Sequence, residues 1–266
     1  MKFLIRAIVI LALGGVASAA AAQGTGEPPH SVPPSSKPTA AKPPPSDLTP
    51  EQVQAIERII HDYLMRNPEV ILDAVESLEQ KRNEQARETA KSAIAEHRDE
   101  ILNDPDSPVA GNAKGDVTIV EFFDYRCPYC KQVEPSLAQL REEDPNVRFV
   151  YKELPILGPD SVVATRAALA ARKQKKYQEL HDALMRARGT LDEATVLKIA
   201  SEVGIDTKQL KADMTSPDVE RIIKRNIDLA HSLTISGTPG FIIGNQLVPG
   251  AVDMATLKSL VADARK

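Results

Sequence analysis

The sequence predicts an α/β fold, in which a mixed β-sheet is covered by helices on both faces and is preceded by an α-helical arm. Three observations support this prediction. An apolar run over 117–123 is followed at once by a helical pattern from Cys127, and a second apolar run covers 147–151. A long helical block then separates these runs from two short apolar segments at 241–243 and 247–248. A strand–helix–strand unit with a C-terminal hairpin requires both parallel and antiparallel neighbours in one sheet.

The composition is that of a globular protein with 266 residues, 42% of them hydrophobic and 26% charged. This length is enough for one or two domains with a real core. The net charge of -4 argues against a nucleic-acid partner. Two cysteines exclude a multi-bridge disulfide scaffold and are too few for a closed four-ligand zinc site. Three roles remain possible for the two cysteines: a redox pair, a metal-binding pair shared between subunits, or a small static disulfide loop.

Residues 1–22 are typical of a secretory signal peptide, with Lys2 and Arg6 before an apolar run and small residues that allow cleavage after Ala19 or Ala22. An uncleaved membrane anchor is the weaker reading, because the apolar run over 7–16 falls short of the roughly 20 residues that span a bilayer. We therefore expect export to the periplasm, an oxidising compartment. Residues 23–47 are rich in proline and predict a flexible linker.

Residues 48–103 predict the helical arm. Thr49, Pro50 and Gln52 form a capping-box pattern, an apolar stripe follows over 53–64, and Asn67-Pro68 separates a second helix. From 79 to 100 the sequence is almost entirely charged residues, glutamine and alanine. The stripe is too narrow to make a core alone, so something must cover it. We favour self-association between subunits over packing on the chain's own later domain.

Residues 104–266 predict the catalytic domain, beginning at the break over 103–108. Val109-Ala110 suggests a short edge strand, and Asp144-Pro145 ends the helix that opens at Cys127. The helical insert covers about 155–233. Gly244-Asn245 predicts the hairpin turn, and Asp253 is expected to cap a final helix.

Cys127 and Cys130 lie within one turn of a predicted helix N-terminus. Free backbone N–H groups and the positive end of the helix dipole stabilise an anion there, so a thiolate is favoured. A thiolate is the attacking group in thiol–disulfide exchange. A static disulfide is the alternative, but its loop is too small to add much stability.

The run Phe-Phe-Asp-Tyr-Arg-Cys-Pro-Tyr-Cys-Lys over 122–131, together with Ser-Gly-Thr-Pro over 236–239, resembles the thioredoxin superfamily. The long helical insert looks like the DsbA-like branch, in which a helical domain interrupts the thioredoxin fold. This resemblance covers roughly 107–266. The preceding helices are similar in placement to the oligomerisation arm of ScsC-type disulfide isomerases.

The resemblance implies a role for each matching residue. Cys127 would be the exposed nucleophile, Cys130 the resolving thiol, and Glu121 the buried acid that moves protons to and from Cys130. Pro239 would be a cis-proline facing the cysteines, and the backbone of Thr238 would pair with a substrate strand. The plainer alternatives are a charge at a strand edge for Glu121 and an ordinary turn for Pro239.

The function expected from the resemblance is that of an exported thiol–disulfide oxidoreductase. Its Cys-Pro-Tyr-Cys pair would isomerise or reduce disulfides in misfolded or oxidised exported proteins, with Pro128 and Tyr129 in contact with substrate. Because Tyr129 adds no positive charge beside Cys127, we expect a less oxidising pair than in the strongest oxidases. The expected partners are thiol-bearing substrates, an unidentified redox partner and further copies of this chain through 48–103. No cofactor, resident metal or nucleic acid is expected.

Two rival functions remain open at this point. One is a monomeric DsbA-like dithiol oxidase whose arm folds back on its own domain. The other is a Cu(I)-binding periplasmic module, since soft thiolates suit that ion. Two further expectations concern single residues: all five histidines are expected to be solvated, and Lys152 either approaches Glu121 from the next strand or is solvated.

Overall fold

The computed structural model describes residues 48–266. The predicted signal peptide (1–22) and proline-rich linker (23–47) lie outside the described residues. The chain divides into two compact units, with the boundary between Met65 and Arg66. Within 48–266, no helix combines the length and the apolar character needed to cross a bilayer.

Helix α1 (Pro50–Arg66) belongs almost entirely to the first unit and has no buried residue. Its predicted capping box is confirmed, because the Thr49 backbone N–H donates to Gln52 Oε1 at 2.8 Å and the Gln52 N–H donates to Thr49 Oγ1 at 3.4 Å. These bonds satisfy two of the donors that a helix start leaves free. The predicted break at Asn67-Pro68 is also confirmed, since the next helix starts at Glu69.

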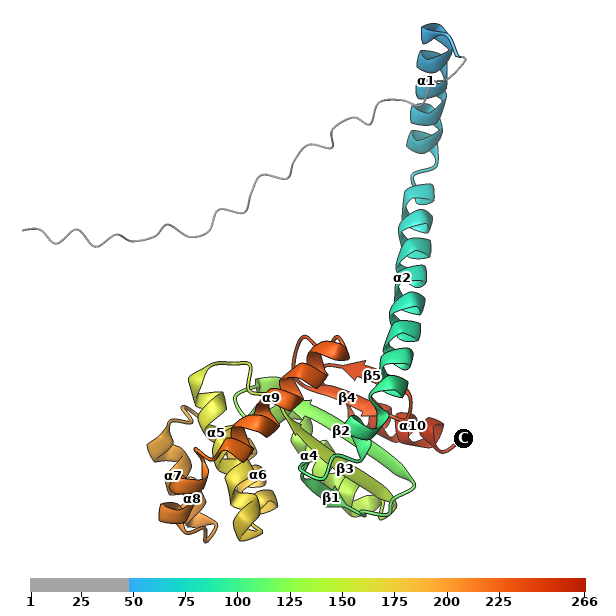
Figure 1. The fold of residues 1–266 in the computed structure, drawn as a ribbon. Coiled ribbons are helices and arrows are strands. Elements are labelled where there is room, and N and C mark those ends of the chain that lie inside the picture. Colours follow the sequence, from blue (N-terminus) through green and yellow to red (C-terminus); the bar gives the residue numbers. More distant parts are fainter. Residues whose placement is uncertain (1–47) are drawn as a thin grey trace, which may run out of the picture. The chain divides into compact units, whose positions relative to one another are not determined.

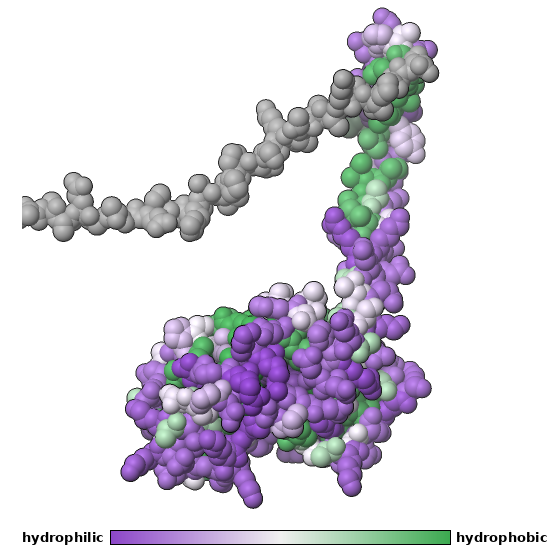
Figure 2. Space-filling model, viewed as in Figure 1, coloured by the Kyte–Doolittle hydropathy of each residue, from purple (hydrophilic) through white to green (hydrophobic). Residues whose placement is uncertain are grey.

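Helix α2 (Glu69–Glu96) and the short α3 (Arg98–Leu102) open the second unit. Leu48, just before α1, and most large apolar side chains of α1 and of the first half of α2 are exposed, and Figure 2 shows hydrophobic patches on these helices. They are Leu48, Val53, Ile56, Ile59, Ile60, Tyr63, Met65, Ile71, Leu72, Val75 and Leu78. By contrast, Ile94 and Ile101 are buried with residues of the sheet, so the end of α2 and all of α3 contribute to the core of the second unit.

The sheet has five strands in the order β1-β3-β2-β4-β5 (Figure 1). They are β1 (Val109–Gly111), β2 (Val117–Phe123), β3 (Val147–Glu153), β4 (Gly240–Ile243) and β5 (Gln246–Pro249). Strands β2 and β3 are parallel and every other pair is antiparallel. The predicted mixed sheet is therefore confirmed, with the predicted edge strand at β1 and the predicted hairpin at β4–β5.

Alternate residues of the central strands enter two separate cores, because successive strand side chains point to opposite faces. One core contains Ile119, Phe123, Phe149 and Tyr151 and is covered by α4 (Pro128–Glu143), α10 (Met254–Ala264) and the helical insert. The other contains Val120, Phe122, Val150, Leu154 and Ile242, with Ile94 of α2, Ile101 of α3, and Leu229 and Ala230 of α9. Helices therefore cover both faces of the sheet, as predicted.

The insert between β3 and β4 consists of helices that follow one another closely. They are α5 (Pro159–Ala171), the one-turn η1 (Arg172–Gln174), α6 (Tyr177–Arg186), α7 (Glu193–Glu202), α8 (Thr207–Asp213) and α9 (Pro217–Ser232). Figure 1 shows α5 to α8 grouped beside the sheet and α9 crossing toward it. Helix α10 then closes the domain, and its predicted cap is confirmed by a 2.8 Å bond from the Thr256 N–H to the Asp253 carboxylate.

Lys152 corrects one expectation. It pairs with Phe122 rather than Glu121 in the parallel register, and its side chain enters the core opposite to that of Glu121. It is only 1% exposed, and its ammonium donates to Asp104 Oδ2 at 3.0 Å and to the Glu100 carbonyl at 2.7 Å. Both the contact with Glu121 and the solvated lysine were therefore wrong, because strand alternation and the end of α3 decide where this charge goes.

Candidate active site

Cys127 ends the segment that follows β2 and is the N-cap of α4, with Pro128 at the first helical position. The local sequence explains this placement. Proline has a backbone angle suited to a helix start and no N–H to satisfy, so the helix begins directly after Cys127. Cys130, three residues on, is fully buried.

The two sulfurs are free thiols, and Cys127 faces the loop before β4. Its Sγ donates to the carbonyl oxygen of Thr238 at 3.1 Å. Cys127 is only 3% exposed, which corrects the expectation of an openly exposed nucleophile. The Thr238 carbonyl, from a loop 111 residues away in sequence, accounts for part of this burial.

The Thr238-Pro239 peptide bond is cis, as predicted, and lies beside Cys127. The Gly250 N–H donates to the Pro239 carbonyl at 2.8 Å, which ties this loop to the end of β5. A cavity of about 210 Å³ runs along the loop and is lined by residues 234–240 with Leu247, Pro249 and Gly250. Phe241, by contrast, lies wholly in the core.

Glu121 lies in the middle of β2, between Phe241 of β4 and Tyr151 of β3. It is 2% exposed, and neither of its carboxylate oxygens has a hydrogen-bond partner among residues 48–266. Burial raises the pKa of Glu121 well above its usual range, and the negative charge of Glu134 adds to this. Burial, and then the charge of Glu121, likewise raise the pKa of the Cys130 thiol. The structure thus places an unpartnered acid and a buried thiol close enough to influence each other's charge.

Pro128 and Tyr129, between the two cysteines, are both exposed, and the Tyr129 side chain is 62% exposed. They form the solvent-facing rim beside Cys127. This is the position from which the predicted contact with substrate would be made.

Asp124 organises the loop that leads to Cys127, and sequence reasoning assigned it no role. It is fully buried, and Oδ1 accepts the Arg126 N–H at 2.7 Å. Oδ2 accepts the N–H groups of Ile156 and Leu157 at 2.9 and 3.0 Å. One carboxylate thereby fixes both the turn before Cys127 and the loop after β3. An aspartate directly after an apolar strand was the available signal.

Lys131 also turns inward rather than acting as a free cation near the thiols. Its ammonium donates to the carbonyls of Leu184, Met185 and Ala187 at 2.7, 3.1 and 2.9 Å. These carbonyls lie at the C-terminal end of α6, where cations are favoured. Burial lowers the pKa of Lys131 to about 8. The residue after Cys130 therefore joins the active-site helix to the insert.

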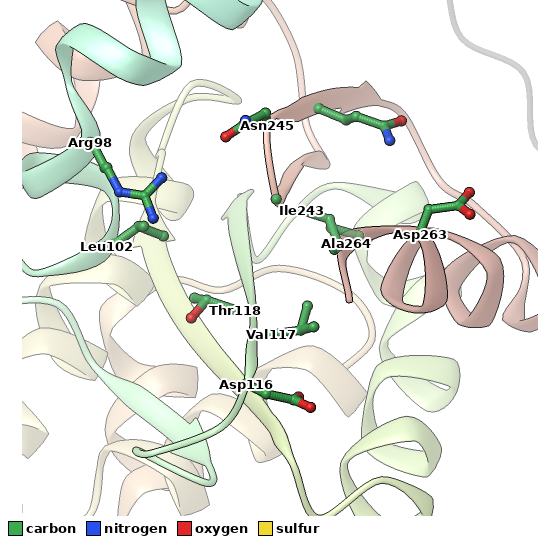
Figure 3. Close-up of a pocket in the computed structure, with 11 residues that line it drawn as sticks. Arg98, Leu102, Asp116, Val117, Thr118, Ile243, Asn245, Asp263 and Ala264 are labelled. Carbon is green, nitrogen blue, oxygen red and sulfur yellow. The ribbon is translucent and has the colours of Figure 1, made fainter. Parts of the chain in front are cut away.

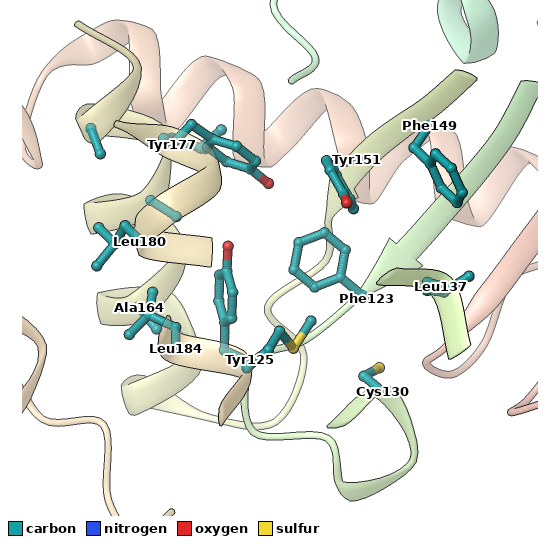
Figure 4. Packing of buried hydrophobic residues seen from close by; sticks show 14 of the residues in the cluster. Phe123, Tyr125, Cys130, Leu137, Phe149, Tyr151, Ala164, Tyr177, Leu180 and Leu184 are labelled. Carbon is teal, nitrogen blue, oxygen red and sulfur yellow. The ribbon is translucent and has the colours of Figure 1, made fainter. Parts of the chain in front are cut away.

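His181 corrects the expectation that all histidines are solvated, because it is fully buried. Its ring contacts those of Phe123, Tyr125, Tyr151 and Tyr177, with centroid distances of 4.5–5.7 Å. Figure 4 shows the four aromatic partners of His181, which are Phe123, Tyr125, Tyr151 and Tyr177, between the strands and the helices of the insert. The sequence did carry a signal, since His181 falls within the apolar stripe of Tyr177, Leu180 and Leu184.

A buried carboxylate, Glu153, joins the same cluster. The hydroxyls of Tyr125 and Tyr177 donate to its Oε1 at 3.0 and 2.8 Å, and the Thr165 hydroxyl donates to Oε2 at 2.9 Å. Burial raises the pKa of Glu153 to about 8, against the opposite effect of these three donors. The bonds connect the end of β3 with α5 and α6, so the interface between the sheet and the insert is partly polar.

A second cavity, of about 440 Å³, lies at the other end of β2, between α3, the β4–β5 turn and the end of α10 (Figure 3). Arg98, Asp116 and Asp263 are among its lining residues, and none of its described lining residues is a cysteine or histidine. The chemistry of the thiols is therefore confined to the end of β2 where α4 begins.

Comparison with known proteins agrees with this geometry. Residues 118–262 match the family described as DSBA-like thioredoxin domain. Residues 52–85 match the family described as Copper resistance protein ScsC N-terminal domain. The catalytic half and the arm are thus recognised separately.

Solved structures and curated proteins are also similar to this chain. A thioredoxin-like oxidoreductase from Silicibacter pomeroyi is 51% identical to this chain, with a TM-score of 0.62. The matched region is 63% of this chain and 97% of the solved one. A Proteus mirabilis ScsC variant with its linker deleted is 30% identical, with a TM-score of 0.63, over 83% of this chain and 98% of that one. The Na(+)/H(+) antiporter NhaA 1 of Salinispora arenicola is 32% identical over 164 residues, which is 60% of this chain. The chain spans about a quarter of the length of that curated relative.

Proposed function

The chain belongs to the DsbA-like thioredoxin family of thiol–disulfide oxidoreductases, and we propose that it acts as an exported disulfide isomerase or reductase. The observation that carries the proposal is the contact at 3.1 Å between the Cys127 thiol and the Thr238 carbonyl, next to Pro239. With Cys130 and Glu121 buried behind it, this arrangement suits attack by one thiol and resolution by the other.

The proposed reaction begins when the Cys127 thiolate attacks one sulfur of a substrate disulfide. A mixed disulfide forms, and the other substrate sulfur leaves as a thiolate that takes a proton from solvent. In reduction, Cys130 then attacks the Cys127 sulfur, releases the second substrate thiolate and passes its own proton to Glu121. In isomerisation, another substrate thiol attacks instead, and Cys127 returns as a thiolate with no net oxidation.

The neighbouring residues receive proposed roles in holding the substrate. The backbone of Thr238 would pair with an extended substrate segment, and Pro239 would keep that segment beside Cys127. Pro128 and Tyr129 would contact the substrate from the exposed rim. The cavity along residues 234–240 supports this assignment, because it opens beside the same loop.

We propose that the pair is less oxidising than the strongest oxidases of the family. No cationic side chain lies between Cys127 and Cys130, and the Lys131 ammonium is engaged by three carbonyls. A redox titration of the mature protein against glutathione tests this. A potential near about -120 mV, typical of a strong oxidant, would contradict it.

We further propose that the arm joins several copies of the chain. Exposed apolar residues on α1 and the first half of α2, and the match of 52–85 to the ScsC N-terminal family, support this. Several catalytic domains on one assembly could hold a misfolded protein while its disulfides are exchanged.

The test is deletion of residues 48–78, which removes the exposed apolar part and retains Ile94 and Ile101 of the core. We expect a monomer by light scattering that still reduces a model disulfide but no longer isomerises a scrambled protein. The matched control is the full-length mature protein at the same concentration of active sites. Unchanged isomerisation by the monomer would refute the role of the arm.

A Cu(I)-binding role is the second candidate, supported by two free thiols and by the similarity of residues 52–85 to a family described as a copper resistance protein domain. Turnover of insulin disulfides with dithiothreitol distinguishes the two, since a metal carrier has no catalytic cycle there. We also propose that the protein is exported and that its substrates are exported proteins with thiols or disulfides. An unidentified partner protein would reset its redox state.

A further inference from the structure

Glu134 lies beneath the active site and is not used by the reaction proposed above. It follows Cys130 by four residues on α4, so the two side chains share one face of the helix. Its side chain is 11% exposed, yet Oε2 is buried and has no hydrogen-bond partner among the described residues. After burial itself, the charge of Glu134 has the largest effect on Glu121. Glu134 is therefore near enough to Glu121 to affect its charge, and its own side chain reaches the protein surface.

His181 of α6 faces the buried oxygen of Glu134. Its Nε2 is 3.7 Å from Glu134 Oε2 and is also buried without a hydrogen-bond partner among residues 48–266. Its Nδ1 lies 3.1 Å from the Tyr125 hydroxyl. Because that hydroxyl donates its only proton to Glu153, its oxygen accepts from the N–H at Nδ1. His181 Nε2 and Glu134 Oε2 are therefore two buried polar atoms that face each other at 3.7 Å, beyond hydrogen-bond distance.

Other charged groups face this pair from each element around it. Arg141 Nη2 lies 3.9 Å from Glu134 Oε1 and 3.9 Å from Asp182 Oδ1, and Arg141 Nη1 donates to the Tyr151 hydroxyl at 2.6 Å. The guanidinium supplies the positive charge between the two carboxylates, so no bound cation is needed. It also leaves Oε2 as the oxygen of Glu134 that is free to exchange a proton.

We propose that Glu134, positioned by His181, carries the proton between Glu121 and solvent during the resolving step, an inference that rests on the proposed function. As Cys130 bonds to the Cys127 sulfur and the substrate thiolate leaves, the Cys130 proton goes to Glu121. Glu121 passes it to Glu134, which releases a proton to solvent at its exposed edge. His181 is a positioning residue, because it acts on the reaction only through the carboxylate of Glu134.

The experiment separates the two chemical steps in the mature full-length protein. Glutathione disulfide is mixed with the reduced protein, and acid-quenched samples are analysed by mass spectrometry from pH 5 to 9. Formation of the mixed disulfide is measured alone in a Cys130→Ser background. His181→Gln and Glu134→Gln are the test variants, and Glu142→Gln is the matched control, an exposed glutamate on the same helix.

We expect both test variants to slow the resolving step by about tenfold at neutral pH and to alter its pH profile. This effect is smaller than the loss of a residue that acts directly as the general acid or base, which typically slows a reaction by about 100-fold or more. Mixed-disulfide formation should stay within about twofold of wild type, and the control should change neither step. An unchanged resolving step, or equal slowing of both steps at every pH, would overturn the proposal. If His181→Gln fails to fold, Glu134→Gln decides alone. Absence of any mixed disulfide in the Cys130→Ser protein would instead reject the proposed function itself.

Discussion

At the scale of single residues, the site is dominated by a buried acid that the fold does not neutralise. Glu121 is an acidic residue within the otherwise largely apolar central strand β2. No residue within 48–266 forms a hydrogen bond with its carboxylate oxygens. Burying an ionised carboxylate without a partner is costly, so burial raises the pKa of Glu121 and strengthens its hold on a proton. That cost is consistent with a residue retained for proton transfer rather than for stability.

We predict that Glu121→Gln stabilises the reduced protein above acidic pH. The folded-state pKa of Glu121 is raised, so the native state holds a proton that the unfolded chain loses above its ordinary pKa of about 4.3. Stability of the wild type relative to the variant should therefore fall as pH rises from that value toward the folded-state pKa. Each pKa unit by which folding raises the pKa of Glu121 corresponds to about 1.4 kcal/mol in the free energy of unfolding.

Urea unfolding of both proteins over a pH series measures this difference. Glu142→Gln serves as the control and should show no such trend, because its side chain is exposed. A constant difference between Glu121→Gln and wild type across the series would contradict the prediction.

At the scale of elements, Lys131 holds the active-site helix to the insert. Its three bonds to the end of α6 predict that Lys131→Met destabilises the protein by about 1–3 kcal/mol, since hydrogen bonds to charged groups are worth more than neutral ones. Equilibrium unfolding in urea measures it. Lys198→Met, at a side chain 78% exposed, is the control and should change stability by less than about 0.5 kcal/mol.

A second contact between elements secures α3 and the segment before β1. Asp104 accepts from Lys152 at 3.0 Å, from the Ser107 hydroxyl at 2.7 Å and from Arg225 at 2.7 Å. Burial opposes ionisation of Asp104, but the bonds from Ser107 and Lys152 outweigh it and lower its pKa. Burial lowers the pKa of Lys152. The carboxylate and ammonium thus depend on each other for their charge.

We therefore predict that Asp104→Asn costs about 3–5 kcal/mol, because it leaves a buried ammonium without its counter-charge. The double variant Asp104→Asn/Lys152→Met should lose less than the sum of the two single variants. A double-mutant cycle from urea unfolding gives the coupling directly. Additive losses would show that the two side chains do not stabilise each other.

At the scale of the whole molecule, the exposed apolar face of the arm contrasts with the well-packed catalytic domain. Ile59 is 66% exposed and Leu72 is 71% exposed, values that are unusual for large apolar side chains gathered on one segment. If this face joins copies of the chain, a charge placed there should separate them without affecting the thiols.

We predict that Ile59→Glu lowers the oligomeric mass measured by light scattering and leaves the rate of mixed-disulfide formation at Cys127 unchanged. Arg58→Glu introduces the same side chain on the other side of α1 and is the control, which should keep the assembly. Equal masses for the two variants and wild type would count against an interface on α1.

Much of the architecture followed from local patterns in the sequence. The capping box at Thr49, the strand before Cys127, the proline-led helix after it and the cap at Asp253 all form as expected, because each depends on neighbours within a few residues. The same holds for the alternation that divides the sheet residues between two cores. Lys152 and His181 were misread because their partners lie far away in the chain.

Local sequence was enough to locate the dithiol, at the point where a strand ends and a helix that begins with proline follows. The surroundings of the dithiol come from the fold: the Thr238 carbonyl beside Cys127, the unpartnered Glu121, and the contact of His181 with Glu134. The physical reason is range. Helix starts and strand periodicity arise from adjacent residues, whereas burial and charge depend on which distant segments the fold brings together.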